Sequence, residues 1–412
     1  MIMKVTKTNR ILGDIYISGS KNAALPCICC ALLTKQKVIL QNIPDIEDVR
    51  NLLIIIKKLG VKVKRQNNEI ILSSKHLKSE VMNEVVSKLR GSYYLMGVLL
   101  ARTSKVRMLY PGGCNLGERP IDYHLSGFEQ LGFKVTKEKE FIEIKAEQKE
   151  GGIVTFPDIS LGATINVIFA AVLLKGVTII NNPSLEPEVL CVIDMLTKMG
   201  ANIKVEDQQV IIVGVKKLTG TTHQNIYDRI EAGSYMLLAG VVPNSRVVLH
   251  NANLEHLELI ITVLRKMGIK ITKNQDSLVV EGTNKIHKAN ILIGPYPFFP
   301  TDLQQILTVV LTRASGTSTI EDPVFPNRIA HLKELRKMGA YVYEDKGIIY
   351  IKESKIKSAK VQATDLRCAF GLIVAGAIAN GNTYIKDIDY LFRGYEKPIE
   401  KLKAIGINVQ II

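Results

Sequence analysis

The chain carries at residues 59–63 the phrase Leu59-Gly60-Val61-Lys62-Val63: a large apolar residue, a glycine, two variable residues and a β-branched residue. The phrase returns five more times, with its glycine at Gly132, Gly200, Gly268, Gly339 and Gly406. Successive glycines stand 67 to 72 residues apart. Such regular spacing indicates an internal repeat.

Each copy of the phrase marks the end of a helix and the start of a strand. Before the first copy, Leu52, Ile55, Ile56 and Leu59 recur three and four residues apart, which predicts one buried helix face. A glycine in the left-handed conformation commonly ends such a helix. The alternating apolar residues that follow predict a strand, then a turn and a second strand.

The first half of each unit predicts another helix and strand. A small or polar residue opens an apolar run, and a strand such as 38–41, 177–181 or 247–250 follows it. We expect the six helices to begin at Ser20, Gly91-Ser92, Ser160, Gly233-Ser234, Thr301-Asp302 and Thr364-Asp365. Helix starts of this kind present free backbone N–H groups that bind phosphates and carboxylates.

Six units of helix, strand, helix, strand, strand predict an α/β protein. Common solenoid repeats span about 20–50 residues, so units of this length favour globular domains. A chain of 412 residues is also too long for one compact core. We therefore expect two domains of three units each.

The composition limits the classes of partner. The chain has 54 basic and 39 acidic residues, a formal charge of +15, which favours anionic ligands. It has no tryptophan and no run of five like charges, so we expect no nucleic-acid partner. Its apolar stretches are too short to span a membrane, and residues 1–12 lack the apolar segment of a signal peptide. The expectation is a soluble, cytoplasmic protein without membrane insertion.

Cysteine and histidine spacing predicts no metal site. The six cysteines fit no paired zinc motif, and Cys27, Cys29 and Cys30 are typical of small buried apolar residues. The histidines lack zinc-helix spacing, and no phosphate-loop or dinucleotide fingerprint is present. We expect neither a metal nor an organic cofactor.

Eight stretches together resemble the enolpyruvyl transferase family, and within it the UDP-N-acetylglucosamine 1-carboxyvinyltransferases. They are SGSKNAALP at 18–26, RGSYYLMG at 90–97, PGGCNLGERPID at 111–122, DRIEAG at 228–233, FPTDLQQ at 299–305, NR at 327–328, DLR at 365–367 and RGYE at 393–396. The resemblance runs essentially from end to end.

The resemblance implies a fold and a reaction. The fold is a two-domain inside-out α/β barrel, with residues 21–226 in one domain, 1–20 plus 227–412 in the other, and the active site between them. The reaction moves the enolpyruvyl group of phosphoenolpyruvate to the 3′-hydroxyl of UDP-N-acetylglucosamine through a tetrahedral intermediate. It releases phosphate and is the first committed step of peptidoglycan synthesis.

Two residues carry the implied proton transfers. Position alone favours Asp302 as a helix N-cap, whereas the resemblance makes it the general base for the sugar hydroxyl. Cys114 stands in a glycine-rich segment that we expect to act as a lid. By resemblance Cys114 donates a proton to phosphoenolpyruvate or assists product release, and is alkylated by the epoxide fosfomycin.

The resemblance also implies the binding residues. For phosphoenolpyruvate they are Lys21, Asn22, Arg119, Arg393, Arg328 and Arg367. For UDP-N-acetylglucosamine they are Arg90, Arg119, Pro120, Ile121, Asp122, Tyr123, Ser160, Leu161, Asp302 and Val324. Arginine suits such sites because its planar fork donates two hydrogen bonds to a carboxylate or phosphate. A Lys-Asn pair such as Lys21-Asn22 is otherwise typical of solvated surface.

Two alternatives to this function stay open. A relative acting on shikimate 3-phosphate is disfavoured because it does not use a cysteine like Cys114. A non-catalytic or altered-specificity paralogue would explain four departures from the family pattern, at Glu118, Asp158, Phe298 and Pro326. It would not explain why Cys114 and Asp302 are both present. The sequence leaves the oligomeric state, the open or closed conformation and the existence of a second copy undecided.

Overall fold

The computed structural model describes residues 1–112, 121–147 and 150–412. The chain divides into two compact units, one formed by Met1–Ser18 with Tyr227–Ile412 and the other lying within residues 19–226. Within the described ranges, no helix is both long and apolar enough to cross a membrane.

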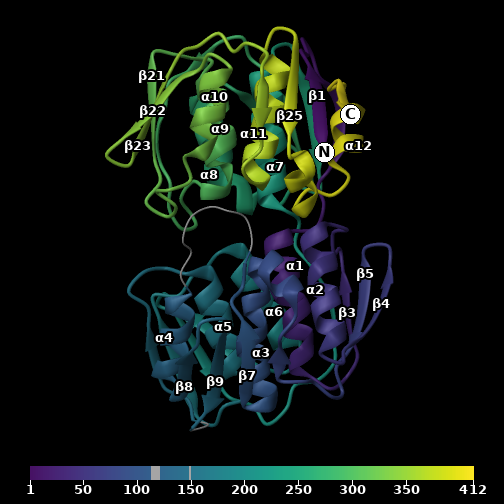
Figure 1. Ribbon diagram of the computed structural model, residues 1–412, viewed down its shortest axis with the longest axis vertical. Coiled ribbons are helices and arrows are strands. Elements are labelled where there is room, and N and C mark those ends of the chain that lie inside the picture. Colours follow the sequence, from purple (N-terminus) through teal and green to yellow (C-terminus); the bar gives the residue numbers. More distant parts are fainter. Residues whose placement is uncertain (113–120, 148–149) are drawn as a thin grey trace. The chain divides into compact units, whose positions relative to one another are not determined.

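In the unit within residues 19–226, three helices form the interior. They are α1 (Lys21–Cys30), α3 (Tyr94–Thr103) and α5 (Leu161–Ala171). In α5 every residue from Gly162 to Ala171 is buried, the pattern of a helix surrounded by protein on all sides. The same unit contains the helices α2 (Glu47–Lys58), α4 (Asp122–Gln130) and α6 (Pro187–Lys198) (Figure 1). Each of these three helices keeps one polar face.

Three four-stranded sheets cover this helical core, and each uses the same strand order. A short edge strand pairs in parallel with the next strand, and two antiparallel strands follow. The first sheet is β14 (Thr222–Gln224), β3 (Val38–Gln41), β5 (Glu69–Ser73) and β4 (Lys62–Gln66). The second is β6 (Glu80–Val81), β7 (Lys105–Leu109), β9 (Phe141–Ala146) and β8 (Phe133–Lys137). The third is β10 (Ile153–Thr155), β11 (Val177–Asn181), β13 (Gln209–Val213) and β12 (Asn202–Glu206).

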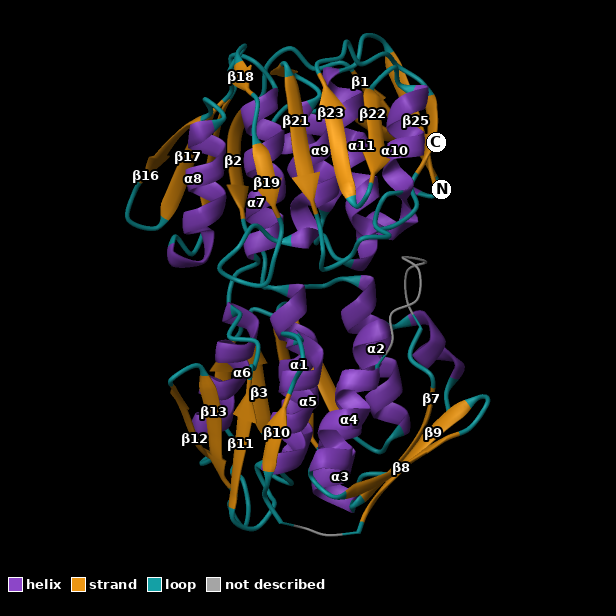
Figure 2. Ribbon diagram, turned by 90° about the vertical axis from the view of Figure 1, so that its left-hand side faces the viewer, coloured by secondary structure: helices purple, strands orange, loops and turns teal. Residues whose placement is uncertain are grey.

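The other unit repeats this plan. Its buried helices are α7 (Arg229–Val241), α9 (Gln304–Leu311) and α11 (Leu366–Ile378), and its half-exposed helices are α8 (Glu258–Lys266), α10 (Ala330–Lys337) and α12 (Pro398–Ala404). In Figure 2 the strands lie outside the buried helices, with β21 and β23 against α9.

The sheets of this unit have the same strand order. One is β2 (Leu12–Tyr16), β15 (Arg246–His250), β17 (Ser277–Glu281) and β16 (Lys270–Lys273). Another is β19 (Asn290–Leu292), β21 (Thr317–Glu321), β23 (Ile348–Lys352) and β22 (Tyr341–Asp345). The last is β24 (Lys360–Gln362), β25 (Asn382–Lys386), β1 (Ile2–Thr6) and β26 (Val409–Ile411), and a small pair joins β18 (Ile286–His287) to β20 (Ala314–Ser315).

The chain termini explain why one unit is discontinuous. The N-terminal strands β1 and β2 complete sheets with β25 and β15 of the unit that contains the C-terminus. The strand β14, which precedes α7, pairs instead with β3 in the unit within residues 19–226. The strand that a simple tandem repeat would place before α7 is thus supplied by β2.

The structure confirms the left-handed conformation predicted for the glycine of each repeat phrase. All six of its glycines have φ between +76° and +97°, a region that costs free energy for any residue with a Cβ. The expected inside-out α/β barrel is also confirmed, since helices lie inside and sheets outside in both units.

One expected helix start is wrong. The fourth buried helix, α7, begins at Arg229, and Gly233 and Ser234 lie buried within it. Asp228 caps this helix by accepting hydrogen bonds from the backbone N–H groups of Ile230 and Glu231. The capping carboxylate, a better N-cap than glycine, sets the start one turn earlier.

Candidate active site

Asp302 lies in a single 3-10 turn, Thr301–Leu303, directly before α9. The N-cap residue of the turn is Pro300 and that of α9 is Leu303, so Asp302 caps neither. The N-cap interpretation of Asp302 is therefore wrong, and its carboxylate is available for other partners.

Two buried arginines bind the Asp302 carboxylate. Arg328 Nη1 donates to Oδ1 at 3.0 Å, and Arg367 Nη2 donates to Oδ2 at 2.9 Å. The arginine side chains are 3% and 5% exposed, whereas that of Asp302 is 24% exposed. Desolvation opposes ionisation of Asp302, but the charges of Arg367 and Arg328 outweigh it and hold the pKa of the carboxyl well below its usual range.

The backbone fixes both arginines before any ligand arrives. Arg328 Nη1 also donates to the carbonyl of Thr301 at 2.8 Å. Arg367 stands in the first turn of α11, whose N-cap Asp365 accepts from its backbone N–H at 2.8 Å. The Arg367 guanidinium lies 5.4 Å from the centre of the Tyr395 ring. The cluster is a pair of buried cations around one partly exposed carboxylate.

Two other predicted binding residues belong to the same unit as Asp302, the one formed by Met1–Ser18 with Tyr227–Ile412. Arg393 ends the 3-10 helix Ile388–Arg393, which packs on α11. Val324 is 38% exposed, and its N–H donates to Asp322, which also accepts from the Thr301 hydroxyl at 2.7 Å. Asp322 thus links the Val324 loop to the turn that holds Asp302.

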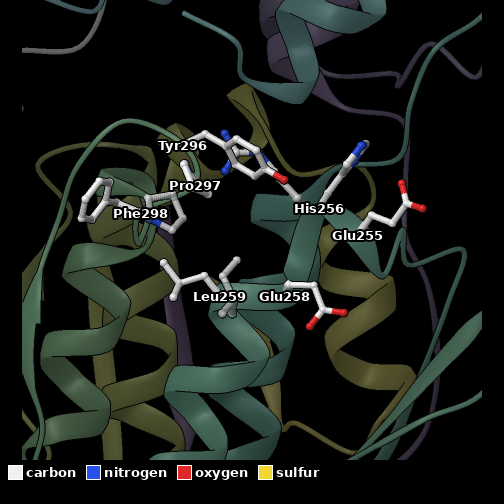
Figure 3. Close-up of a pocket in the computed structure, with 10 residues that line it drawn as sticks. Glu255, His256, Glu258, Leu259, Tyr296, Pro297 and Phe298 are labelled. Atoms are coloured by element: carbon white, nitrogen blue, oxygen red, sulfur yellow. The ribbon is translucent and has the colours of Figure 1, made fainter. Parts of the chain in front are cut away.

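A small pocket in the same unit was not expected from the sequence. Its lining includes Arg229, His256, Tyr296, Phe298 and Pro300, and Figure 3 labels His256, Tyr296 and Phe298 among the side chains around it. Pro300 stands two positions before Asp302 in the sequence. The Arg229 guanidinium lies 5.6 Å from the centre of the Tyr296 ring. The sequence signals near this pocket were the quoted motifs at 228–233 and 299–305 and the departure at Phe298.

In the unit within residues 19–226, Lys21 opens α1 with Asn22 beside it. Lys21 Nζ lies 2.8 Å from an oxygen of Asp48, and the two side chains are 14% and 3% exposed. Ser20 caps the same helix by accepting from the N–H of Ala23. The solvated-surface interpretation of Lys21 is wrong, because a buried carboxylate holds its ammonium group. Asp48 itself was not predicted.

The expected nucleotide-sugar residues of this unit occupy several elements. Arg90 lies in the 3-10 helix Arg90–Tyr93, with its guanidinium 5.9 Å from the Tyr93 ring. Ser160 caps α5, and Leu161 is its first residue. The start of α5 at Ser160 is as expected, whereas α3 begins at Tyr94, after the 3-10 helix that contains Gly91 and Ser92.

Residues 121–123 lie at the start of α4 and point to different partners. Ile121 is buried, while Asp122 pairs with Lys137 at 3.0 Å on the surface. The Tyr123 hydroxyl donates to Asp158 at 2.8 Å, which raises the pKa of Tyr123. Asp158, one of the departures from the family pattern, is therefore attached to a predicted binding residue. Cys114, Arg119, Pro120 and the lid lie outside the described residues.

Known sequences resemble this chain over nearly its whole length. The family profile described as EPSP synthase (3-phosphoshikimate 1-carboxyvinyltransferase) matches residues 5–402. UDP-N-acetylglucosamine 1-carboxyvinyltransferase 2 of Geobacillus kaustophilus is 41% identical, over 99% of this chain and 96% of the relative. UDP-N-acetylglucosamine 1-carboxyvinyltransferase of Halothermothrix orenii is 42% identical, over 98% and 97%.

Solved structures share the fold at low identity. The enolpyruvyl transferase NikO from Streptomyces tendae superposes with a TM-score of 0.90 at 19% identity, covering 99% of this chain and 98% of that one. EPSP synthase from Acinetobacter baumannii gives a TM-score of 0.76 at 19% identity, covering 99% of both chains.

Proposed function

Because this chain belongs to the enolpyruvyl transferase family, we propose that it transfers the enolpyruvyl group of phosphoenolpyruvate to the 3′-hydroxyl of UDP-N-acetylglucosamine. The observation that carries the proposal is 41–42% identity, over nearly the full length, to enzymes named for that substrate. Phosphate is the second product. The role in peptidoglycan synthesis and the cytoplasmic location belong to the same proposal.

The reaction needs one base and one acid. In the addition step the sugar hydroxyl attacks C2 of phosphoenolpyruvate, loses its proton to a base, and C3 gains a proton from an acid. In the elimination step phosphate leaves C2 and C3 loses a proton, which restores the double bond. We assign the base to Asp302 and the acid to Cys114.

The arginine cluster makes Asp302 a weak base in the ligand-free chain. A carboxylate whose pKa is held far down accepts a proton poorly. Phosphoenolpyruvate carries a phosphate and a carboxylate, which compete with Asp302 for Arg328 and Arg367. When the substrate takes over these cations, the pKa of Asp302 rises. Substrate binding would thus activate the base only when there is a substrate to act on.

Lys21, Asn22, Arg119 and Arg393 are the other proposed anion-binding residues. A phosphate that leaves with more negative charge than it had in the substrate is stabilised by fixed cations. Lys21 is already oriented by Asp48 at 2.8 Å, so its ammonium group needs little reorganisation. The residues predicted from the sequence for UDP-N-acetylglucosamine are proposed to bind the nucleotide sugar.

A phosphate-release assay tests the activity. The purified chain is incubated with phosphoenolpyruvate and either UDP-N-acetylglucosamine or shikimate 3-phosphate, and the product is identified by mass spectrometry. We expect phosphate and an enolpyruvyl product with the nucleotide sugar alone. Release with shikimate 3-phosphate would reassign the substrate, and release with neither would support a non-catalytic paralogue.

Labelling with fosfomycin tests whether Cys114 is the reactive thiol of the active site. The epoxide should add one equivalent of mass to the chain and stop turnover, because a thiolate opens the ring. Cys114→Ser should take up none, while Cys29→Ala, which removes a buried cysteine of α1, should be labelled like the unchanged chain. Labelling that persists in Cys114→Ser, located by peptide mapping, would contradict the assignment.

A further inference from the structure

Three side chains with soft ligand atoms converge inside the unit within residues 19–226. They are Cys27 of α1, Cys191 of α6 and His223 of β14, and their ligand atoms all lie within 4.8 Å of one another. Cys191 Sγ and His223 Nε2 are 3.3 Å apart. None of these residues has a part in the proposed reaction, and their sequence positions lie up to 196 residues apart.

The three side chains are buried but lie just below the surface. Cys27 is 0% exposed, Cys191 6% and His223 2%. The helices α1 and α6 pack directly on each other (Figure 2), and β14 extends the sheet that covers them. Asp194, one turn after Cys191, is 53% exposed at its side chain. A cation could therefore enter from the side of Asp194.

The second ring nitrogen of His223 supplies an independent observation. Nδ1 is buried and has no hydrogen-bond partner, yet it lies 3.5 Å from an oxygen of Asp194. Histidines that bind a metal through one nitrogen commonly direct the other N–H at a carboxylate, which orients the ring. The placement of Asp194 matches that arrangement.

We propose that Cys27 Sγ, Cys191 Sγ and His223 Nε2 bind one Zn²⁺ ion. Zinc takes thiolate sulfur at about 2.3 Å and imidazole nitrogen at about 2.0–2.1 Å in tetrahedral geometry, so two such ligand atoms stand about 3.5 Å apart. The spacing of 3.3 Å between Cys191 Sγ and His223 Nε2 fits this geometry. Two thiol protons leave to solvent as the metal binds, and a water molecule or small anion takes the fourth position.

The ion would act as an internal clamp. It would join α1, whose first residue is Lys21, to α6 and to β14, which lies just before the chain passes into the other unit. A ligand that binds the folded state stabilises it by mass action. The site is therefore structural, and the zinc takes no part in the proposed transfer reaction.

Metal titration of the whole chain tests this proposal. Because Cys114 could also bind metal, the titration uses Cys114→Ala, reduced and stripped by a chelator. We expect one Zn²⁺ per chain, release of up to two protons, and a rise in Tm of about 5 to 10 °C at zinc well above its Kd. Co²⁺ in place of zinc should give the intense absorption of thiolate–cobalt charge transfer. If the reduced protein binds no zinc and shows no cobalt–thiolate band, the proposal is overturned.

Variants separate this site from adventitious binding. Cys191→Ser and His223→Gln should each weaken zinc binding at least about 100-fold and remove the gain in Tm. Cys29→Ala, a buried cysteine of the same helix, should bind zinc like its parent. If Cys191→Ser fails to fold, His223→Gln and the cobalt spectrum of the parent still decide. Zinc binding that survives His223→Gln would overturn the proposal. A protein that binds no zinc when reduced, and whose Cys27 and Cys191 form a disulfide in air, would also overturn it.

Discussion

Each of the two units has an ion pair at the start of a buried helix, and the more exposed partner has the opposite charge in the two units. Before α9, a carboxylate that is 24% exposed sits on two arginines that are 3% and 5% exposed. At the start of α1, an ammonium group that is 14% exposed sits on a carboxylate that is 3% exposed. In each unit the more exposed partner is a residue assigned to the reaction, and the buried partner orients it. In the Asp302 cluster the buried arginines are assigned to phosphoenolpyruvate as well.

The difference lies in how strongly each group is held. Asp302 faces two arginines, so its ionised form is strongly favoured. Lys21 faces a single carboxylate, Asp48, at 2.8 Å. Asp302 is thus assigned a proton transfer, whereas Lys21 is assigned only to anion binding.

Replacing Asp302 should have the largest effect. Asp302→Asn should lower kcat about 1,000-fold, because a positioned general base contributes about 100- to 10,000-fold. The dissociation constant of UDP-N-acetylglucosamine, measured by calorimetry, should change little. Asp345→Asn, an exposed aspartate of the same unit, serves as the control. Weaker nucleotide-sugar binding with kcat intact would make Asp302 a binding residue only and break the contrast.

Removing the charge of Lys21 comes next. Lys21→Met should lower kcat/KM for phosphoenolpyruvate about 100-fold, since a charge-assisted contact in a desolvated site is worth about 1.5–3 kcal/mol. The pH dependence of kcat should keep its shape, because proton transfer is assigned to Asp302 and Cys114. Lys35→Met, at an exposed position, is the matched control. A shifted pH profile for Lys21→Met would show that both groups exchange protons.

Neutralising Asp48 should be felt mainly as lost stability. Asp48→Asn removes the counter-charge of Lys21, and we expect about 1–2 kcal/mol less free energy of unfolding because the ammonium group can still reach water. Glu206→Gln, whose pair with Lys204 is exposed, should cost less than about 0.5 kcal/mol. Urea unfolding measures both. Equal losses of unfolding free energy in the two variants would show that burial of the Lys21–Asp48 pair adds nothing to stability.

The smallest effect should be a pH dependence. The lowered pKa of Asp302 adds stability above its unfolded pKa, about 3.9, and this contribution is lost as the pH falls through the folded value. The urea midpoint of the unchanged chain minus that of Asp302→Asn should be constant from pH 5 to 7 and shrink below about pH 4. If this difference in urea midpoint grew on acidification, its sign would be opposite to the prediction. That result would exclude a lowered pKa of Asp302 in the folded chain.

Much of the fold could be read locally. The six glycines of the repeat phrase all adopt positive φ, because a helix end followed by a strand leaves its signal in adjacent residues. The buried helices were visible as apolar runs for the same reason. The start of α7 was misjudged because Asp228, the stronger cap, stood one turn before the small residues that the repeat favoured.

The order of residues along the chain determined the sixfold unit, the α/β class and the family, since each is carried by neighbouring residues. Only the tertiary structure decided which charges meet. Arg328 and Arg367 stand 26 and 65 positions after Asp302, Asp48 lies 27 positions after Lys21, and Cys27 reaches Cys191 and His223 from another third of the chain. Such pairings depend on packing between distant segments, and a local pattern cannot encode a partner that folding alone brings near.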